Sequence, residues 1–339
     1  MRRETLVREQ SIVNSRQVLI LVFLLAQLAD VAFAVEGKIA FTSNRAGEWA
    51  IYVMNGDGGN HYRLTDGGSP AWLPNGKKVG FVHGGDIWVI DREGTNRKNI
   101  TKGRFKEGIK TPVWSPDGEQ IAYRSRVGGI FGITDLYLMD ADGRSSRKLT
   151  NDLHHDDRPS WSPDGRNIAF SADLRPQENL LESEIFVIDT NGRNRVNLTQ
   201  NPKAGSTHVS WSPDGSRITY TASPKPLLFH APHNIHVIDA DGTNKVMLTK
   251  EDRWAYEWRP AWSPNSKKIA FVKQTPDGFH DIFTINADGG DLRNITQTHR
   301  VDEFSPAWSP RPLAVPPSGR MVTRWGEVKL NAEIFRTVR

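Results

Sequence analysis

Residues 112–123 read Pro-Val-Trp-Ser-Pro-Asp-Gly-Glu-Gln-Ile-Ala-Tyr, and this stretch decides the fold. Ser-Pro-Asp-Gly has the composition of a tight turn, because proline presets φ, aspartate suits the next position and glycine accepts a positive φ. The residues that follow, Ile121, Ala122 and Tyr123, are typical of a strand with one buried face. The stretch therefore predicts two antiparallel strands joined by a tight turn.

The same pattern recurs along the chain. Tryptophan ends the first strand at positions 72, 114, 161, 211, 262 and 308, at intervals of 42, 47, 50, 51 and 46 residues. A return strand resembling Ile-Ala-Phe, a third strand resembling Ile-Tyr-Val and a fourth strand closing on Leu-Thr or Ile-Thr each occur six times as well. Four strands in a unit of this length are the signature of a propeller blade. We therefore predict an all-β, six-bladed β-propeller over residues 35–310.

The phase of the repeat predicts how the ring closes. The first marker along the chain is a second strand at Ile39, and the last is a first strand at Trp308. The final Trp-Ser-Pro is followed by Arg311 instead of Asp-Gly, so no return turn is expected there. The last strand, 305–309, should complete a blade whose other three strands lie within 38–65, which removes open sheet edges.

The two ends of the chain have a different composition from the repeats. Basic residues, an apolar stretch from Val18 to Leu28 and the motif Ala32-Phe33-Ala34 predict a signal peptide over 1–34. A membrane anchor is the alternative, but the apolar stretch is about half of the roughly 20 residues needed to span a bilayer. No later segment is apolar enough to span a membrane, so we expect an exported chain without a transmembrane segment. Residues 311–339 read as a proline-rich linker and a short C-terminal tail.

Composition limits the partners. The chain has no cysteine, so an exported fold of this kind must be stable by burial alone. The net charge of +5 is scattered, without a basic stripe, which argues against a nucleic-acid partner. No sequence motif implies a cofactor, and a monomer is expected.

The repeat Pro-x-Trp-Ser-Pro-Asp-Gly, then Ile-Ala-Phe, then Ile-Tyr-Val, then Asp-Gly, then Leu-Thr resembles the WD-like propeller repeat of the TolB family over residues 37–310. Three copies, at Trp114, Trp161 and Trp211, match the Trp-Ser-Pro-Asp-Gly core fully. The resemblance implies a periplasmic protein that binds envelope proteins, such as a peptidoglycan-associated lipoprotein, at the mouth of the propeller. TolB carries an additional α/β domain before its propeller, and we expect no room for it here.

Propeller topology assigns the irregular connections to one face, where a site is expected. Aromatic side chains, arginines and carboxylates are typical of a protein-binding rim. We predict that a protein or peptide docks there, although any single residue has the alternative of only solvating a loop. The predicted rim residues are His154, His155, Asp156, Asp157, His208, Asp252, Trp254, Glu257, Trp258, Asp302 and Glu303.

A second reading of the same face is enzymatic. Histidines 154, 155, 208, 230, 233 and 299 all fall in its connections or at the strand ends beside them. Three of them with a carboxylate would suit a divalent metal, and the alternative function is therefore a metal-dependent carbohydrate lyase. The histidine spacing contains no tight ligand motif, so we predict no resident metal and no catalytic residues.

Overall fold

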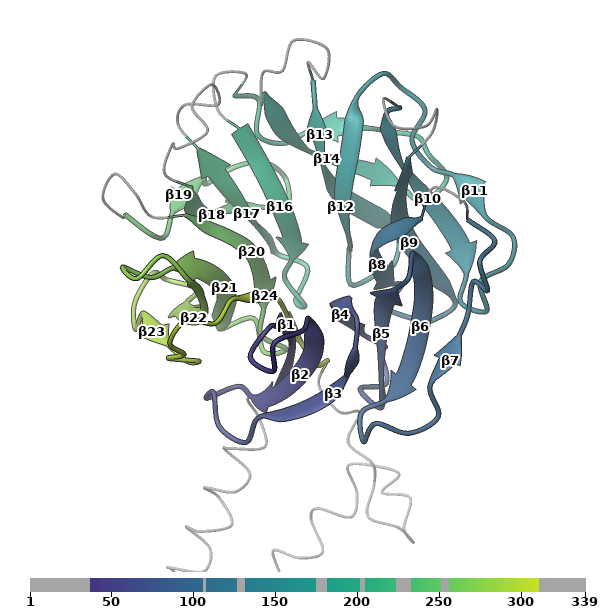
Figure 1. Ribbon diagram of the computed structural model, residues 1–339. Coiled ribbons are helices and arrows are strands. Elements are labelled where there is room, and N and C mark those ends of the chain that lie inside the picture. Colours follow the sequence, from purple (N-terminus) through teal and green to yellow (C-terminus); the bar gives the residue numbers. More distant parts are fainter. Residues whose placement is uncertain are drawn as a thin grey trace, which may run out of the picture.

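The structure, a computed structural model, describes residues 37–105, 108–126, 132–174, 182–201, 205–223, 233–250 and 256–310. In these ranges the strands form six four-stranded antiparallel sheets arranged around a central axis (Figure 1). This confirms the predicted all-β, six-bladed propeller. The predicted signal peptide and C-terminal tail lie outside the described residues. The described part contains no helix long and apolar enough to cross a bilayer.

The six blades follow one another around the ring, and the first strand of each is innermost (Figure 1). Blade 1 consists of β24 (Glu303–Trp308), β1 (Lys38–Ser43), β2 (Ala50–Asn55) and β3 (Tyr62–Asp66). Blade 2 consists of β4 (Gly68–Trp72), β5 (Lys78–His83), β6 (Asp86–Asp91) and β7 (Lys98–Asn99). Blade 3 consists of β8 (Ile109–Trp114), β9 (Gln120–Arg126), β10 (Thr134–Asp140) and β11 (Arg147–Lys148). Blade 4 consists of β12 (His155–Trp161), β13 (Asn167–Asp173), β14 (Ser183–Asp189) and β15 (Val196–Asn197). Blade 5 consists of β16 (Gly205–Trp211), β17 (Arg217–Ser223), β18 (Asn234–Asp239) and β19 (Val246–Met247). Blade 6 consists of β20 (Glu257–Trp262), β21 (Lys268–Gln274), β22 (His280–Asn286) and β23 (Arg293–Asn294).

Blade 1 closes the ring as the repeat phase predicted. Strand β24 pairs antiparallel with β1, so that Trp308 lies opposite Ile39 and Glu303 lies opposite Ser43. The Ser309 backbone N–H donates to the Lys38 carbonyl at 2.7 Å, just beyond the pairing. Two strands 260 positions apart thereby share one sheet, and unfolding one end of the ring must open the other.

The turn motif folds for the reason its sequence suggests. The Gly118 N–H donates to the Ser115 carbonyl at 2.8 Å, and Gly118 has φ 77°, a value that glycine accepts without strain. The Ser115 hydroxyl donates to the Asp117 carboxylate at 2.5 Å and accepts from the Gln120 N–H at 2.9 Å. The motif thus holds its own turn by side-chain hydrogen bonds and fixes the register of the return strand.

The repeated tryptophans fill the wedges between blades. Five of the six are buried, and Trp72 donates its indole N–H to the Ala307 carbonyl of the neighbouring blade at 3.0 Å. Trp114 lies directly over Gly80 of blade 2. Each wedge continues into a small apolar core, one for each interface between blades.

Candidate functional site

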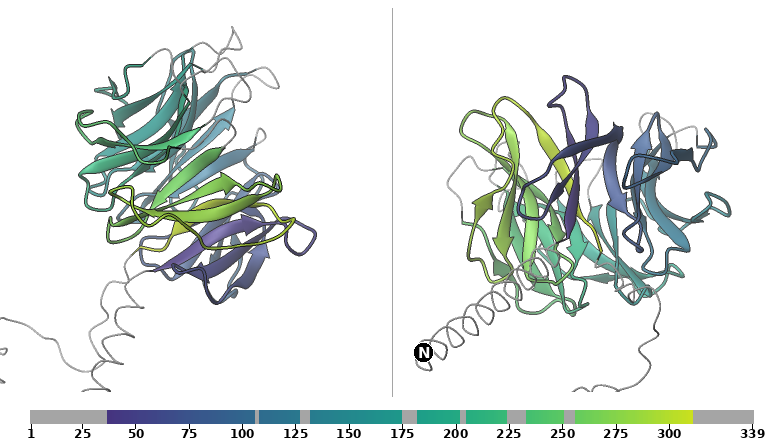
Figure 2. Two further views of the ribbon diagram at one scale, coloured as in Figure 1. Left: turned by 90° about the vertical axis from the view of Figure 1, so that its left-hand side faces the viewer. Right: turned by 90° about the horizontal axis from the view of Figure 1, so that it is seen from below.

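The blades present two different faces. On the turn face, tight turns join the first strand to the second and the third to the fourth. The loop face carries the connections between second and third strands and those between blades. Seen from the side, the strands cross the disc from one face to the other (Figure 2). The predicted rim residues that the structure describes belong to the loop face, because each lies in a connection between blades or near the start of a first strand.

Threonines at the ends of the fourth strands clamp the blades on this face. In blades 2 to 6 the threonine hydroxyl accepts the backbone N–H of the second or third residue of the third strand, at 2.9–3.0 Å. In blade 4, Thr199 also donates to the buried Glu184 carboxylate at 2.6 Å. The fourth strands of these blades are only two residues long. Beyond them, the threonine of the recurring Leu-Thr or Ile-Thr motif takes over the bonding of the third strand's backbone.

Three predicted rim carboxylates are buried instead of exposed. Asp156, Glu257 and Glu303 each have 0% exposure. Each lies five residues before the tryptophan of its blade. Glu257 accepts a hydrogen bond from Thr249, the threonine that ends the preceding blade, whereas Glu303 accepts from Arg45 and from the Ser43 hydroxyl. Burial raises the pKa of Asp156 to about 7, with the nearby Asp135 carboxylate adding to the shift. Glu257 thereby joins two neighbouring blades. That these three carboxylates contact a partner stays a prediction.

The next position along each first strand, four residues before the tryptophan, remains accessible on the loop face. Asp157 occupies it in blade 4 with its side chain 20% exposed, and Trp258 occupies it in blade 6. The Asp157 carboxylate accepts from Arg124 at 2.9 Å and from the Arg158 backbone N–H at 2.7 Å. Asp157 is therefore a surface carboxylate held in place by blade 3.

The position three residues before each tryptophan faces the central channel. We call the six residues there the channel ring; all have φ between 50° and 56°, and the pairing with the second strand is interrupted at the same point in each blade. A β-bulge of this kind redirects a side chain, and the proline that follows in five of the six blades has no N–H to lose at the interruption. The channel ring lines a cavity of about 150 Å³ and consists of Ser69, Thr111, Arg158, His208, Arg259 and Ser305.

Aromatic rings cross the loop face from blade 5 to blade 1. Trp258 stacks on Phe304, its equivalent in blade 1, with centroids 6.4 Å apart and an interplanar angle of 19°. His280 packs against both, at 5.2 and 5.0 Å. Phe304 also contacts Trp49, which is 47% exposed. We call this continuous set the aromatic ladder, and it consists of His233, Tyr256, Trp258, His280, Phe304 and Trp49.

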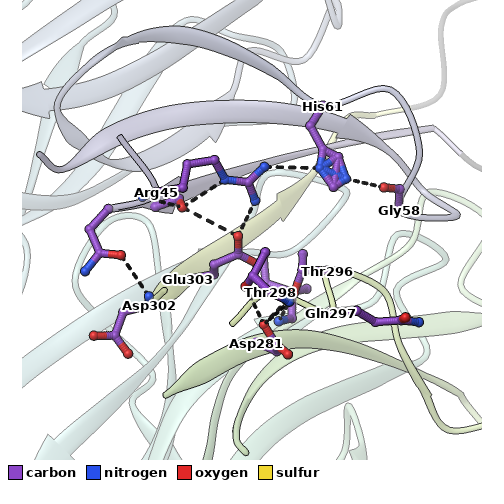
Figure 3. A network of polar contacts seen from close by, with 12 residues as sticks. Arg45, Gly58, His61, Asp281, Thr296, Gln297, Thr298, Asp302 and Glu303 are labelled. Carbon is purple, nitrogen blue, oxygen red and sulfur yellow. Dashed lines mark hydrogen bonds and ion pairs between the residues drawn. The ribbon is translucent and has the colours of Figure 1, made fainter. Parts of the chain in front are cut away.

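Ion pairs support the ladder at the seam between β24 and β1, where the ring closes, and between blades 6 and 1. Figure 3 shows Arg45, from the connection after β1, bonded to the buried Glu303 carboxylate. The Arg45 guanidinium also contacts His61 Nδ1 at 3.2 Å. On the ladder itself, the predicted rim residue Asp302 pairs with His280 at 2.7 Å. The seam that closes the ring thus also fixes the exposed aromatic groups.

The remaining predicted residues are separated from the ladder. His154 lies beside Asp152 and Arg195, and His155 Nδ1 accepts the Thr134 backbone N–H at 3.1 Å. Two predicted rim residues, Asp252 and Trp254, lie outside the described residues. So does His230, one of the histidines considered as a metal ligand. Among the residues that the structure describes, no three His, Asp or Glu side chains converge as a metal site.

Sequence reasoning missed most of the side chains that the loop face brings together. His208 and Trp258 were predicted, but Arg158 and Arg259 of the channel ring, and Trp49 and Phe304 of the ladder, were not. The sequence does contain a signal for several of them. Channel-ring residues stand three positions before each repeat tryptophan, and Trp258 and Phe304 stand four positions before theirs.

The fold and its repeats define the class: the chain is a six-bladed propeller of TolB-like repeats. A family model described as the TolB beta propeller domain matches residues 68–181. The Tol-Pal system protein TolB of Anaeromyxobacter dehalogenans is 30% identical over 129 residues, which cover 34% of this chain and 27% of that protein. The chain therefore spans about a quarter of the length of this curated relative.

Solved structures show the same fold. TolB from Acinetobacter baumannii superimposes with a TM-score of 0.66 at 21% identity, over 82% of this chain and 67% of that one. An oligogalacturonate lyase in complex with manganese superimposes with a TM-score of 0.55 at 16% identity, over 77% of this chain and 74% of the lyase. At these identities the likeness concerns the fold, and the function must be argued from the loop face.

Proposed function

We propose that the protein is a non-enzymatic binding module of the cell envelope whose loop face docks a protein or peptide partner on the aromatic ladder. The observation that carries the proposal is the exposure of Trp49 at the end of a continuous row of aromatic rings in contact. Large aromatic side chains with polar neighbours are the groups that contribute most to binding energy in protein interfaces. Arg45 and Asp302 supply such neighbours beside the ladder.

The kind of partner follows from the likeness to TolB. The matched relative is named as a Tol-Pal system protein, which supports an envelope partner resembling a peptidoglycan-associated lipoprotein. The predicted signal peptide over 1–34 supports export to the periplasm. The partner must present apolar groups, because the ladder offers ring faces and edges along its length and few charges.

The first experiment places a photo-crosslinking amino acid at Trp49 in cells that express the full chain. The control places it at Val246, a residue 52% exposed on β19, at the outer edge of blade 5. We expect one defined envelope protein to be crosslinked from position 49 and not from position 246. Equal crosslinking from both positions, or none from position 49, would overturn the assignment of this face.

The second experiment measures the affinity of that partner for Trp49→Ala. Truncating a tryptophan that anchors an interface costs about 2 kcal/mol or more, which raises the dissociation constant roughly thirtyfold. Because Trp49 is exposed, the variant should fold normally, and Val246→Ala should bind like the wild type. An affinity unchanged by Trp49→Ala would exclude the ladder from the interface.

A further inference from the structure

The channel ring has one charged half and one hydroxyl half. Blades 4, 5 and 6 contribute Arg158, His208 and Arg259, which are neighbours around the axis. Blades 1, 2 and 3 contribute serine or threonine at the same position. All six side chains line one cavity, so two guanidinium groups face the channel from one side and three hydroxyl groups face it from the other.

The negative charge near the two guanidinium groups is already engaged. Within the described ranges, Asp157 is the carboxylate whose charge acts on both Arg158 and Arg259. Its oxygens accept from Arg124 at 2.9 Å and from the Arg158 backbone N–H at 2.7 Å, and Arg158 Nε forms an ion pair with it at 3.6 Å. One carboxylate among three arginines leaves this part of the channel with an excess of positive charge.

The electrostatics of the ring agree with this charge balance. Burial, and after it the charge of Arg158, lower the pKa of Arg259 to about 10, so Arg259 remains protonated at neutral pH. Burial also lowers the pKa of Arg158, but a guanidinium group keeps its charge in proteins. Burial, followed by the charges of both arginines, lowers the pKa of His208 well below its usual range. His208 is therefore neutral and supplies a hydrogen bond instead of a charge. An anion in the channel would relieve the repulsion between the arginines.

The apolar lining of the cavity indicates which kind of molecule would carry the anionic group. Its other lining residues are prolines and valines that follow the ring in each blade. Arg259 lies over the Phe304 ring at 5.7 Å and donates to the Ser305 hydroxyl, which orients its guanidinium group. Guanidinium groups match the two oxygens of a carboxylate, and an apolar wall suits the carbon stem that a carboxylate carries.

We propose that the channel ring binds a carboxylate group on a short apolar stem, held by Arg158 and Arg259 with hydrogen bonds from His208 and the ring hydroxyls. The carboxylate could be the C-terminus of a peptide or a free organic acid, since both present the same chemistry to the ring. This site does not depend on the aromatic ladder, so it stands even if the ladder has no partner.

The test is isothermal titration of the purified protein at low salt with four probes. These are the blocked peptide acid N-acetyl-Ala-Ala-Leu, its C-terminal amide, propionate and inorganic phosphate. We expect saturable binding of the peptide acid, of propionate or of both, and at least tenfold weaker binding of the amide. Tighter binding of the peptide acid than of propionate would identify a chain end as the ligand, and the reverse order would identify a free acid.

Variants then locate the site. Arg158→Gln and Arg259→Gln should each weaken binding of the carboxylate probe at least tenfold. The control is Arg217→Gln, because Arg217 also lies over an aromatic ring, Trp262, but at the turn face. Three results would overturn the proposal: no carboxylate probe binds, phosphate binds in place of both carboxylates, or the ring variants bind like Arg217→Gln. The acid and amide comparison needs only the wild type, so it decides the question even if a ring variant does not fold.

Discussion

Replacing Gly80 by alanine should destabilise the propeller at one defined contact. A Cβ at this position would lie 1.9 Å from Cη2 and 2.1 Å from Cζ3 of Trp114. Carbon atoms pack at about 3.5–4.0 Å, so the indole would have to move by roughly 1.5 Å within a wedge where it is 7% exposed. Overpacking of this kind costs about 1–3 kcal/mol, and we expect the upper half of that range because the indole is rigid.

The matched control is Gly68→Ala in the same blade. A Cβ there would have Thr42 as its nearest neighbour at 3.8 Å, which is ordinary contact, and the added methyl restricts the unfolded chain. The control should therefore be neutral or stabilising by about 0.4–1 kcal/mol. Urea unfolding followed by tryptophan fluorescence measures both variants, and thermal melting should show Gly80→Ala several degrees lower.

A double mutant tests the cause. Trp114→Leu removes the indole and is destabilising by itself, but in that background Gly80→Ala should cost less than about 0.5 kcal/mol. If Gly80→Ala were as well tolerated as Gly68→Ala, or if its cost were unchanged in the Trp114→Leu background, the reasoning from this contact would be refuted.

Three further predictions concern the buried polar groups. Because the folded-state pKa of Asp156 is about 7, native protein holds a proton that the unfolded chain releases, and its free energy of unfolding should fall between pH 4 and 7. Asp156→Asn should flatten that fall, by on the order of 2–4 kcal/mol across the window, in urea titrations at successive pH values. Thr199→Val should cost about 1–3 kcal/mol, because it removes the hydroxyl that bonds the buried Glu184, whereas Thr199→Ser should retain most of the stability. Arg45→Met should cost about 3 kcal/mol by leaving Glu303 buried without its ion pair, and adding Glu303→Gln should restore much of the loss.

Each of these has a contrary result that would count against it. An Asp156→Asn profile parallel to that of the wild type would mean that this carboxyl does not hold the proton. Equal losses in Thr199→Val and Thr199→Ser would point to packing instead of the hydroxyl. An additive Arg45→Met and Glu303→Gln double mutant would mean that the two side chains are not coupled across the seam.

The sequence alone determined the fold because the repeat is local. Each blade encodes its own turns and strand alternation, and Ser115 and Asp117 bond within the turn that they form. Six copies of one local pattern leave a single architecture, and the offset between Ile39 and Trp308 determines how it closes. The channel-ring positions, and Trp258 and Phe304 of the ladder, also have constant offsets from the tryptophans.

Only the tertiary structure decided which residues near the loop face are exposed. Asp156 and Asp157 are adjacent and chemically alike, yet one is fully buried and the other reaches the surface, because alternate residues of a strand point in opposite directions. The bulge that follows breaks this alternation and turns Arg158 into the channel. The convergence of Arg158 with Arg259, about 100 positions apart in the sequence, depends on the curvature of the ring. The contact of Trp49 with Phe304, 255 positions apart, depends on the pairing of β24 with β1 that closes it.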